Sequence, residues 1–141
     1  MNDQQMLRQI AKTAQMGQVG IHAVMPYASQ SALRQALKCQ RAEYISIEQQ
    51  ALNLAKNRGF RPGRLSPAAK MMAQLSSKSR LISGDRNSKI AGMMVQGSTR
   101  GMIESLQNAG KWQGSDPAIA SLAQKLLETE EQNLQQLKGF L

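Results

Sequence analysis

Cysteine and histidine are almost absent from this sequence. Of its 141 residues, one is a cysteine, Cys39, and one is a histidine, His22. A single cysteine excludes a disulfide within the chain and a zinc site built from several cysteines. Both residues fall off the apolar positions of the helices that carry them, so we expect Cys39 to be a surface thiol and His22 a boundary residue. This placement argues against nucleophilic catalysis by a cysteine–histidine pair.

Long apolar runs and strand patterns are also missing. No stretch approaches the roughly 18 apolar residues of a membrane span, and the N-terminus MNDQQMLRQI is polar where a secretory signal would be apolar. We therefore expect a cytoplasmic protein that does not contact a membrane. No segment alternates apolar and polar residues over the length of a strand, so we expect no sheet.

Acidic residues are few, and the resulting positive charge is unevenly placed. The chain has 18 lysines and arginines against nine acidic residues, a net charge of +9. Most of the excess lies between residues 56 and 89, where Asp85 is the only acid among nine basic residues. A concentrated charge is more informative about partners than a uniform excess, because it defines a surface that attracts anions.

Helical periodicity dominates what is present. Apolar residues recur every three or four positions from about Asp3 to Ala28, from about Ala32 to Arg58, over Lys89–Gly110, and from Pro117 to Leu141. Ser66-Pro67 predicts the start of a shorter helix that ends near Ile82. We expect one all-α domain, residues 1–141, in which four long helices form an antiparallel bundle and the short helix lies in the second connection.

Two glycines, Gly97 and Gly101, lie on the broad apolar arc of the helix predicted over Lys89–Gly110. Each costs roughly 1 kcal/mol of helix propensity relative to alanine, so another interaction should offset the cost. We expect a neighbouring helix to approach closely at both glycines. Space for a ligand beside the helix is the alternative.

Glu130 lies in the middle of the apolar face of the last helix, and Gln40 and Tyr44 lie on that of the second. A buried carboxylate needs a donor or a proton, so we expect a core polar cluster of Gln40, Tyr44 and Glu130. A weak metal or small-ligand site at Glu130 is the alternative. A complete di-iron site is excluded because no Glu-x-x-His motif occurs.

The basic segment 56–89 is the other candidate site. Phosphate contacts would come from Arg58, Arg61, Arg64, Lys78 and Arg80. Only Phe60 is available to stack on a base, so binding to nucleic acid is possible but not favoured. A solvated surface that aids solubility is the simpler interpretation.

The segment IAGMMVQGSTRGMIESL, Ile90–Leu106, and the closing ETEEQNLQQLKGFL resemble a known group of proteins. They are similar to small ferritin-like bundle proteins from anaerobic Firmicutes. The resemblance implies a ferritin-like bundle and implies no activity. The chain departs from metal-binding members of the superfamily, because Gln96-Gly97-Ser98 has no acid and no histidine pairs with Glu130.

These patterns lead to a functional expectation without an enzyme or a cofactor. We expect a non-enzymatic binding or self-assembly module that forms a homo-oligomer through a methionine-rich helix face, because methionine adapts to irregular contacts. The alternatives are a degenerate metal or small-ligand site in the bundle core, and weak polyanion binding through residues 56–89.

Overall fold

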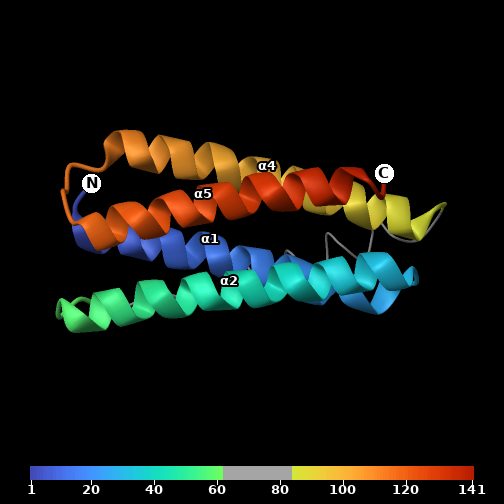
Figure 1. Ribbon diagram of the computed structural model, residues 1–141, viewed down its shortest axis with the longest axis horizontal. Coiled ribbons are helices and arrows are strands. Elements are labelled where there is room, and N and C mark those ends of the chain that lie inside the picture. The colour runs from blue at the N-terminus through green and yellow to red at the C-terminus, as the bar shows by residue number, and fades with distance from the viewer. Residues whose placement is uncertain (62–83) are drawn as a thin grey trace.

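The computed structural model describes residues 1–61 and 84–141 and contains four long helices (Figure 1). They are α1 (Asp3–Val24), α2 (Ser31–Asn57), α4 (Arg86–Lys111) and α5 (Pro117–Lys138), and a 3-10 turn, η1 (Met25–Tyr27), follows α1. No strand occurs within these residues. The predicted all-α, four-helix architecture is confirmed. The short helix expected from Pro67 to Ile82 lies outside the described residues.

The helices run in two opposite directions (Figure 1). α1 and α5 begin at the end where the N-terminus lies, and α2 and α4 end there. Two hydrogen bonds fix this arrangement: the terminal amino group of Met1 donates to Lys111 O at the end of α4, and Arg58 at the end of α2 binds Asp116 at the start of α5. The chain therefore leaves α2 at one end of the bundle and enters α4 at the other.

The core lies along the bundle axis and draws apolar residues from all four helices. Its fully buried large side chains include those of Leu7, Ile21, Leu33, Leu37, Ile47, Ile90, Ile119 and Leu137. Burying each such side chain contributes about 1.5–3 kcal/mol relative to leaving it in water. The three- and four-residue spacing in the sequence places these side chains on one face of each helix, and this common burial holds the bundle together.

The start of α1 is capped by the residue that precedes the helix. Asn2, rather than Asp3, caps α1: its Oδ1 accepts from Gln5 N at 2.9 Å, and Gln5 Oε1 accepts from Asn2 N at 2.9 Å. This reciprocal pair satisfies two of the amide groups that a helix start leaves without partners. Asp3 is thereby available for a contact with the indole of Trp112, a residue distant in sequence.

The turn between α1 and α2 is tied to the start of α4. Pro26 ends regular helix α1 and lies in η1, because its ring prevents the backbone from continuing the helix. The Gln30 side chain makes no capping bond to α2. A side chain of another helix binds this turn instead: Asn87 Oδ1 of α4 accepts from Ser29 N at 2.9 Å and from Gln30 N at 3.2 Å. The Asn87 side chain thus links the turn between α1 and α2 to the start of α4.

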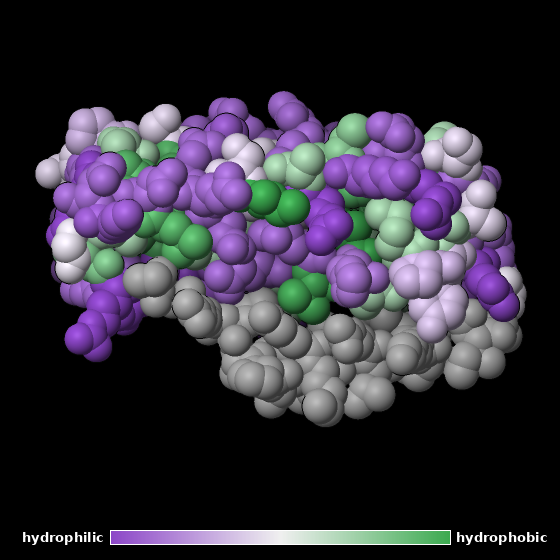
Figure 2. Space-filling model, turned by 90° about the horizontal axis from the view of Figure 1, so that it is seen from below, coloured by the Kyte–Doolittle hydropathy of each residue, from purple (hydrophilic) through white to green (hydrophobic). Residues whose placement is uncertain are grey.

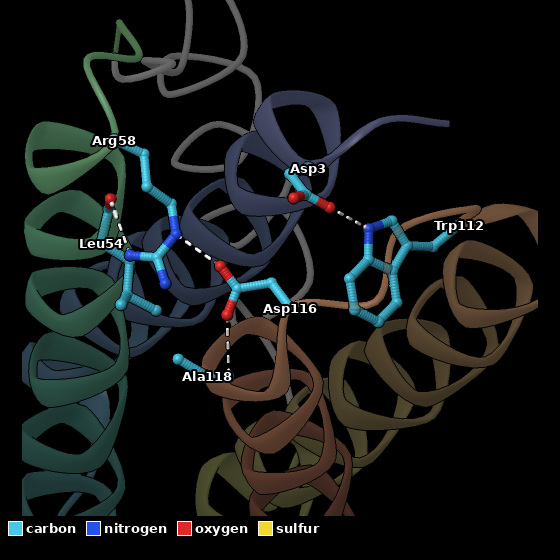
Figure 3. A network of polar contacts seen from close by, with 6 residues as sticks. All are labelled: Asp3, Leu54, Arg58, Trp112, Asp116 and Ala118. Atoms are coloured by element: carbon cyan, nitrogen blue, oxygen red, sulfur yellow. Dashed lines mark hydrogen bonds and ion pairs between the residues drawn. The ribbon is translucent and has the colours of Figure 1, made fainter.

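The opposite end of the bundle is closed by two polar contacts (Figure 3). Arg58 Nε donates to Asp116, whose other oxygen accepts from Ala118 N and caps α5. Trp112 Nε1 donates to Asp3 Oδ1 at 2.8 Å. These contacts join α2 to α5 and the end of α4 to α1, so all four helices are fixed where the chain would otherwise fray.

Among the described residues, no helix combines the length and the apolar character needed to cross a bilayer.

Candidate functional site

Glu130 is a carboxylate buried in the bundle, with a relative exposure of 2%. It lies on the inward face of α5 between Leu126 and Leu137, at the spacing that repeats one face of a helix. Its Oε2 accepts a hydrogen bond of 3.0 Å from Tyr44 Oη of α2, and Tyr44 is equally buried. The structure therefore brings together two of the three residues expected to form the core cluster.

Two glycines make room for this pair. A Cβ atom on Gly101 of α4 would lie 2.9 Å from the Glu130 carboxyl carbon, and one on Gly17 of α1 would lie 2.5 Å from the Tyr44 ring. Such distances are too short for real side-chain contacts, so the carboxylate and the ring occupy the space that a larger residue would need. All four helices thus contribute to the site: α1 and α4 through glycines, α2 through Tyr44 and α5 through Glu130.

Burial raises the pKa of Glu130 from 4.5 to about 7, because the charged form loses its hydration. The hydrogen bond from Tyr44 and the nearby Ser98 hydroxyl lower the pKa but only partly offset burial, and the negative charge of Glu104 raises it further. The pKa of Tyr44 is also raised, first by burial and then by the nearby charge of Glu130. The pair therefore carries at most one negative charge near neutral pH.

Among the described residues, two buried polar atoms near this pair, Ser98 Oγ and Asn133 Nδ2, have no hydrogen-bond partner with good geometry. The same holds for Gln40 Oε1, one turn before Tyr44 on α2. Each belongs to a residue that is at most 2% exposed. Ser98 and Asn133 nevertheless lie near enough to Tyr44 to influence its pKa. Buried polar atoms are almost always paired, so this group has unused hydrogen-bonding capacity beside the carboxylate.

Gln40 is buried as expected but does not bind Glu130. Its Nε2 donates to Gln136 Oε1 of α5 at 2.9 Å, two turns further along than Glu130. Sequence reasoning missed Ser98 and Asn133, and it did not assign Gly17 of the inward face of α1 to this site. Ser98 and Asn133 follow Met94 and Glu130 by four and three positions, so the helical repeat that identified Glu130 would also have placed them inside.

The close packing expected at the glycine pair does not hold at Gly97. Gly97 is exposed, and no atom of the described residues lies within 4 Å of the position of its Cβ. Gly101 is buried, but what approaches it is the Glu130 side chain rather than a helix backbone. The two glycines are four residues apart, and Gly97 lies just beyond the edge of the inward face, which explains the difference.

The basic residues proposed as polyanion contacts are only partly described. Arg58 is paired with Asp116 and half-buried, so its charge is already neutralised locally. Arg61 is exposed, and its carbonyl accepts from Arg8 Nε at 3.2 Å. Arg64, Lys78 and Arg80 lie outside the described residues. In the part that the structure describes, Arg61 is thus the member of this set that a polyanion could reach.

Other reactive groups lie apart from the core. Cys39 is exposed and free, as expected, and His22 is exposed near the end of α1. Within the described ranges, no group of three or more histidine, cysteine, aspartate or glutamate residues is placed to hold a metal ion. The chemistry available at Glu130 is therefore that of one carboxylate with a phenol, a hydroxyl and amides around it.

These features define the protein as a four-helix bundle with a polar centre in its core. A solved structure with a similar fold is described as "Crystal structure of DUF305 fragment from Deinococcus radiodurans". It matches with a TM-score of 0.75 at 13% sequence identity, over 97% of this chain and 93% of that chain. No family model matches the sequence, and no curated protein matches it. At this identity the similarity shows the fold alone.

The expected resemblance to ferritin-like proteins of anaerobic Firmicutes is wrong. The matching structure is a DUF305 fragment, and neither family models nor curated proteins support the ferritin-like group. The start of the Ile90–Leu106 segment, which suggested the resemblance, is explained by packing: Ile90, Ala91 and Met94 are core residues of α4. Such a pattern is common to amphipathic helices and identifies no family.

Proposed function

We propose that this protein is a non-enzymatic self-assembly module that binds a second copy of itself through the outward face of α4. The observation that carries this proposal is the exposure of two large apolar side chains one turn apart, Ile103 at 51% and Leu106 at 56%. Neighbouring exposed apolar residues on one helix are a common feature of protein interfaces. The methionines of α4 are less suited to this role, because Met94 is a core residue and Met93 and Met102 are only partly exposed.

The charges on the same face favour a second copy as the partner. Arg100 Nε donates to Glu104 Oε1 at 3.2 Å, and both side chains reach solvent. If two α4 helices packed antiparallel about a two-fold axis near residue 102, Arg100 of each would face Glu104 of the other. A two-fold interface requires a self-complementary surface, and this charge pair meets that requirement.

The opposite side of the molecule is less suitable for association. In the coloured part of the face seen in Figure 2, hydrophilic side chains predominate and surround the hydrophobic ones. Single apolar residues of this kind are ordinary on soluble proteins and define no interface. The outward face of α4 is therefore the better candidate among the described surfaces.

Light scattering coupled to size exclusion tests the proposal. We expect the mass of the unsubstituted protein to rise above that of a monomer with concentration, and Ile103→Glu to abolish the rise by placing a charge in the contact. Met16→Glu, at a residue of α1 with 41% exposure, serves as the control and should behave like the unsubstituted protein. A monomeric mass at every concentration would refute self-assembly.

The buried group of Tyr44, Ser98, Glu130 and Asn133, called the core polar cluster from here on, supports a second candidate, the binding of a small ligand at Glu130. The unpaired atoms Ser98 Oγ and Asn133 Nδ2 favour it, since a ligand could complete their hydrogen bonds. Elemental analysis of purified protein and thermal unfolding with added iron, manganese or zinc would test it. Binding should raise the melting temperature of the unsubstituted protein and not that of Glu130→Gln. An unchanged melting temperature and no co-purified metal would exclude the metals.

We also infer that the bundle has the connectivity of ferritin-like folds, in which one connection crosses the length of the bundle. The support is that α2 ends and α4 begins at opposite ends (Figure 1). This inference concerns chain topology and carries no relationship or activity.

A further inference from the structure

The core polar cluster contains groups that can serve either protonation state of Glu130. A charged carboxylate needs donors, whereas a protonated one needs an acceptor for its own hydrogen. Tyr44 Oη lies 3.0 Å from Glu130 Oε2 and supplies a donor to the charged form. The Ser98 hydroxyl has no fixed partner, so it can turn to donate or to accept.

Purely structural packing does not account for this arrangement. Burying a carboxylate that is not paired with a cation costs free energy, so burial of Glu130 gives the bundle no obvious gain in stability. Two helices carry glycine at the positions that accommodate Glu130 and Tyr44, and an interior glycine costs roughly 1 kcal/mol of helix propensity. The burial of a carboxylate and the two helix glycines each lower the stability of the bundle, yet the fold keeps an ionisable group at the point where four helices meet.

The surroundings of Glu130 provide little to hold its negative charge. The titratable groups of the described residues that act on it are Tyr44 from α2 and Glu104 from α4. Glu104 is itself paired with Arg100 at the surface, and α1 presents the uncharged Gly17 behind the Tyr44 ring. On α5 the nearest buried neighbours, Thr129 and Asn133, are uncharged. Among these groups, no buried cation faces the carboxylate, so the neutral, protonated form is favoured.

We propose that the core polar cluster is a binding site for one proton, which Glu130 takes up from water as the pH falls and returns to water as the pH rises. In the protonated state the new O–H can donate to Ser98 Oγ while Glu130 still accepts from Tyr44. In the charged state both hydroxyls must donate, and the core holds an anion. The stability of the bundle is therefore set partly by whether this one proton is bound.

The sign of the effect follows from the two states of the chain. In the unfolded chain Glu130 titrates near 4.5, and in the folded chain its pKa is about 7. The folded state thus holds the proton more tightly, and its advantage is complete below 4.5 and lost as the pH rises through 7. This inference does not depend on self-assembly, because Glu130 lies in the core and not on the outward face of α4.

Unfolding in guanidinium, with and without the carboxyl group, tests the proposal. We expect the unfolding equilibrium constant of the unsubstituted protein, divided by that of Glu130→Gln, to increase by about two orders of magnitude between pH 4 and pH 8. Both proteins share every other titratable group, so the ratio isolates the effect of the Glu130 carboxyl group. Glu131→Gln, which removes an exposed carboxylate next in sequence, is the matched control and should retain the full dependence.

Tyr44→Phe keeps the proposal testable if Glu130→Gln does not fold. Removing the phenol removes a donor that favours the charged form, so the fall in stability should move to higher pH. The proposal is overturned if the unsubstituted protein and Glu130→Gln share one pH dependence. It is equally overturned if the profile of Tyr44→Phe coincides with that of the unsubstituted protein.

Discussion

At the scale of single residues, Gly101 shows how a side chain distant in sequence can restrict a position to glycine. A Cβ on Gly101 would lie 2.9 Å from the carboxyl carbon of Glu130. The carboxylate ends a flexible side chain, but it is buried and accepts a hydrogen bond from Tyr44, so it cannot move without losing that bond. Gly101 is therefore fixed by the polar centre and not by the helix that contains it.

Alanine substitutions at the two glycines of α4 should have opposite effects. We expect Gly97→Ala to raise the free energy of unfolding by up to about 1 kcal/mol, because alanine is the better helix former and the position is open. Gly101→Ala should lower it by about 1–3 kcal/mol, as overpacking of a core does. Chemical unfolding of both variants at pH 8 would measure these changes.

A double variant provides the control for this pair. In a Glu130→Ala background the carboxylate is gone, so Gly101→Ala should cost less than in the unsubstituted protein, by an interaction energy of about 1 kcal/mol or more. Equal costs in the two backgrounds would show that Glu130 is not what excludes a side chain at Gly101.

Residue patterns in the sequence identified part of this site. The helical repeat predicts that Tyr44, as part of an apolar face, and Glu130, as an interruption of one, lie inside, and the structure joins them by a hydrogen bond. The pairing of Gln40 with Gln136 could not be predicted, since it depends on the relative heights of α2 and α5. The contrast between Gly97 and Gly101 depends likewise on which neighbour faces each residue.

At the scale of elements, the helices were predictable because their apolar residues repeat at helical spacing. The residues that cap the helices were harder to predict. Asp3, a good capping residue by type, instead binds Trp112, more than one hundred residues later in the chain, and Asn2 caps α1. Capping preferences describe local chemistry, and a tertiary contact can take a side chain out of local use.

Asn87 offers a test of how one element positions another. Its Oδ1 accepts from the backbone of Ser29 and Gln30, and its Nδ2 donates to Ser29 Oγ at 2.8 Å. We expect Asn87→Ala to lower the free energy of unfolding by about 1–2 kcal/mol, since it removes the hydrogen bonds that hold the turn before α2 against α4. The neighbouring variant Ser88→Ala is the control. Comparable losses in both would indicate a general effect on the start of α4.

At the scale of the whole molecule, the two ends and the core respond differently to pH. The hydrogen bond from Arg58 lowers the pKa of Asp116 below its ordinary 3.8, so this carboxylate stabilises the fold above that pH and the contribution is lost as the pH falls. Burial raises the pKa of Glu130, and also that of Glu43, so these groups act in the opposite sense. The contact at the Asp116 end of the bundle therefore stabilises the fold less as the pH falls, whereas the core around Glu130 stabilises it less as the pH rises.

A stability maximum at mildly acidic pH should result. We expect the free energy of unfolding to be greatest between about pH 4 and pH 5, and to fall by up to about 3 kcal/mol towards pH 8 as the penalty of the charged Glu130 develops. Fluorescence of Trp112, the sole tryptophan, reports unfolding because the indole is held by Asp3 at the end of the bundle. A maximum at neutral or alkaline pH would conflict with the assigned signs.

The direction in which each helix runs along the bundle could not be predicted from the periodicity of apolar residues alone. Short connections predict antiparallel neighbours, which holds for α1 with α2 and for α4 with α5. The direction of α4 relative to α2 depends on the long connection, and it became evident from contacts such as Met1 with Lys111. Since the comparison with a known structure shows only the fold, the role of the protein has to be tested through its own surfaces and core.

The most direct test of the central claim is the titration of the Glu130 carboxyl group in the folded protein. The carboxyl carbon, labelled with ¹³C and assigned by comparison with Glu130→Gln, can be followed by NMR from pH 3 to pH 9. We expect its midpoint near 7, far above the ordinary 4.5, because the carboxyl is buried beside Tyr44 without a buried cation among the described residues. A midpoint at or below 4.5 would contradict the account.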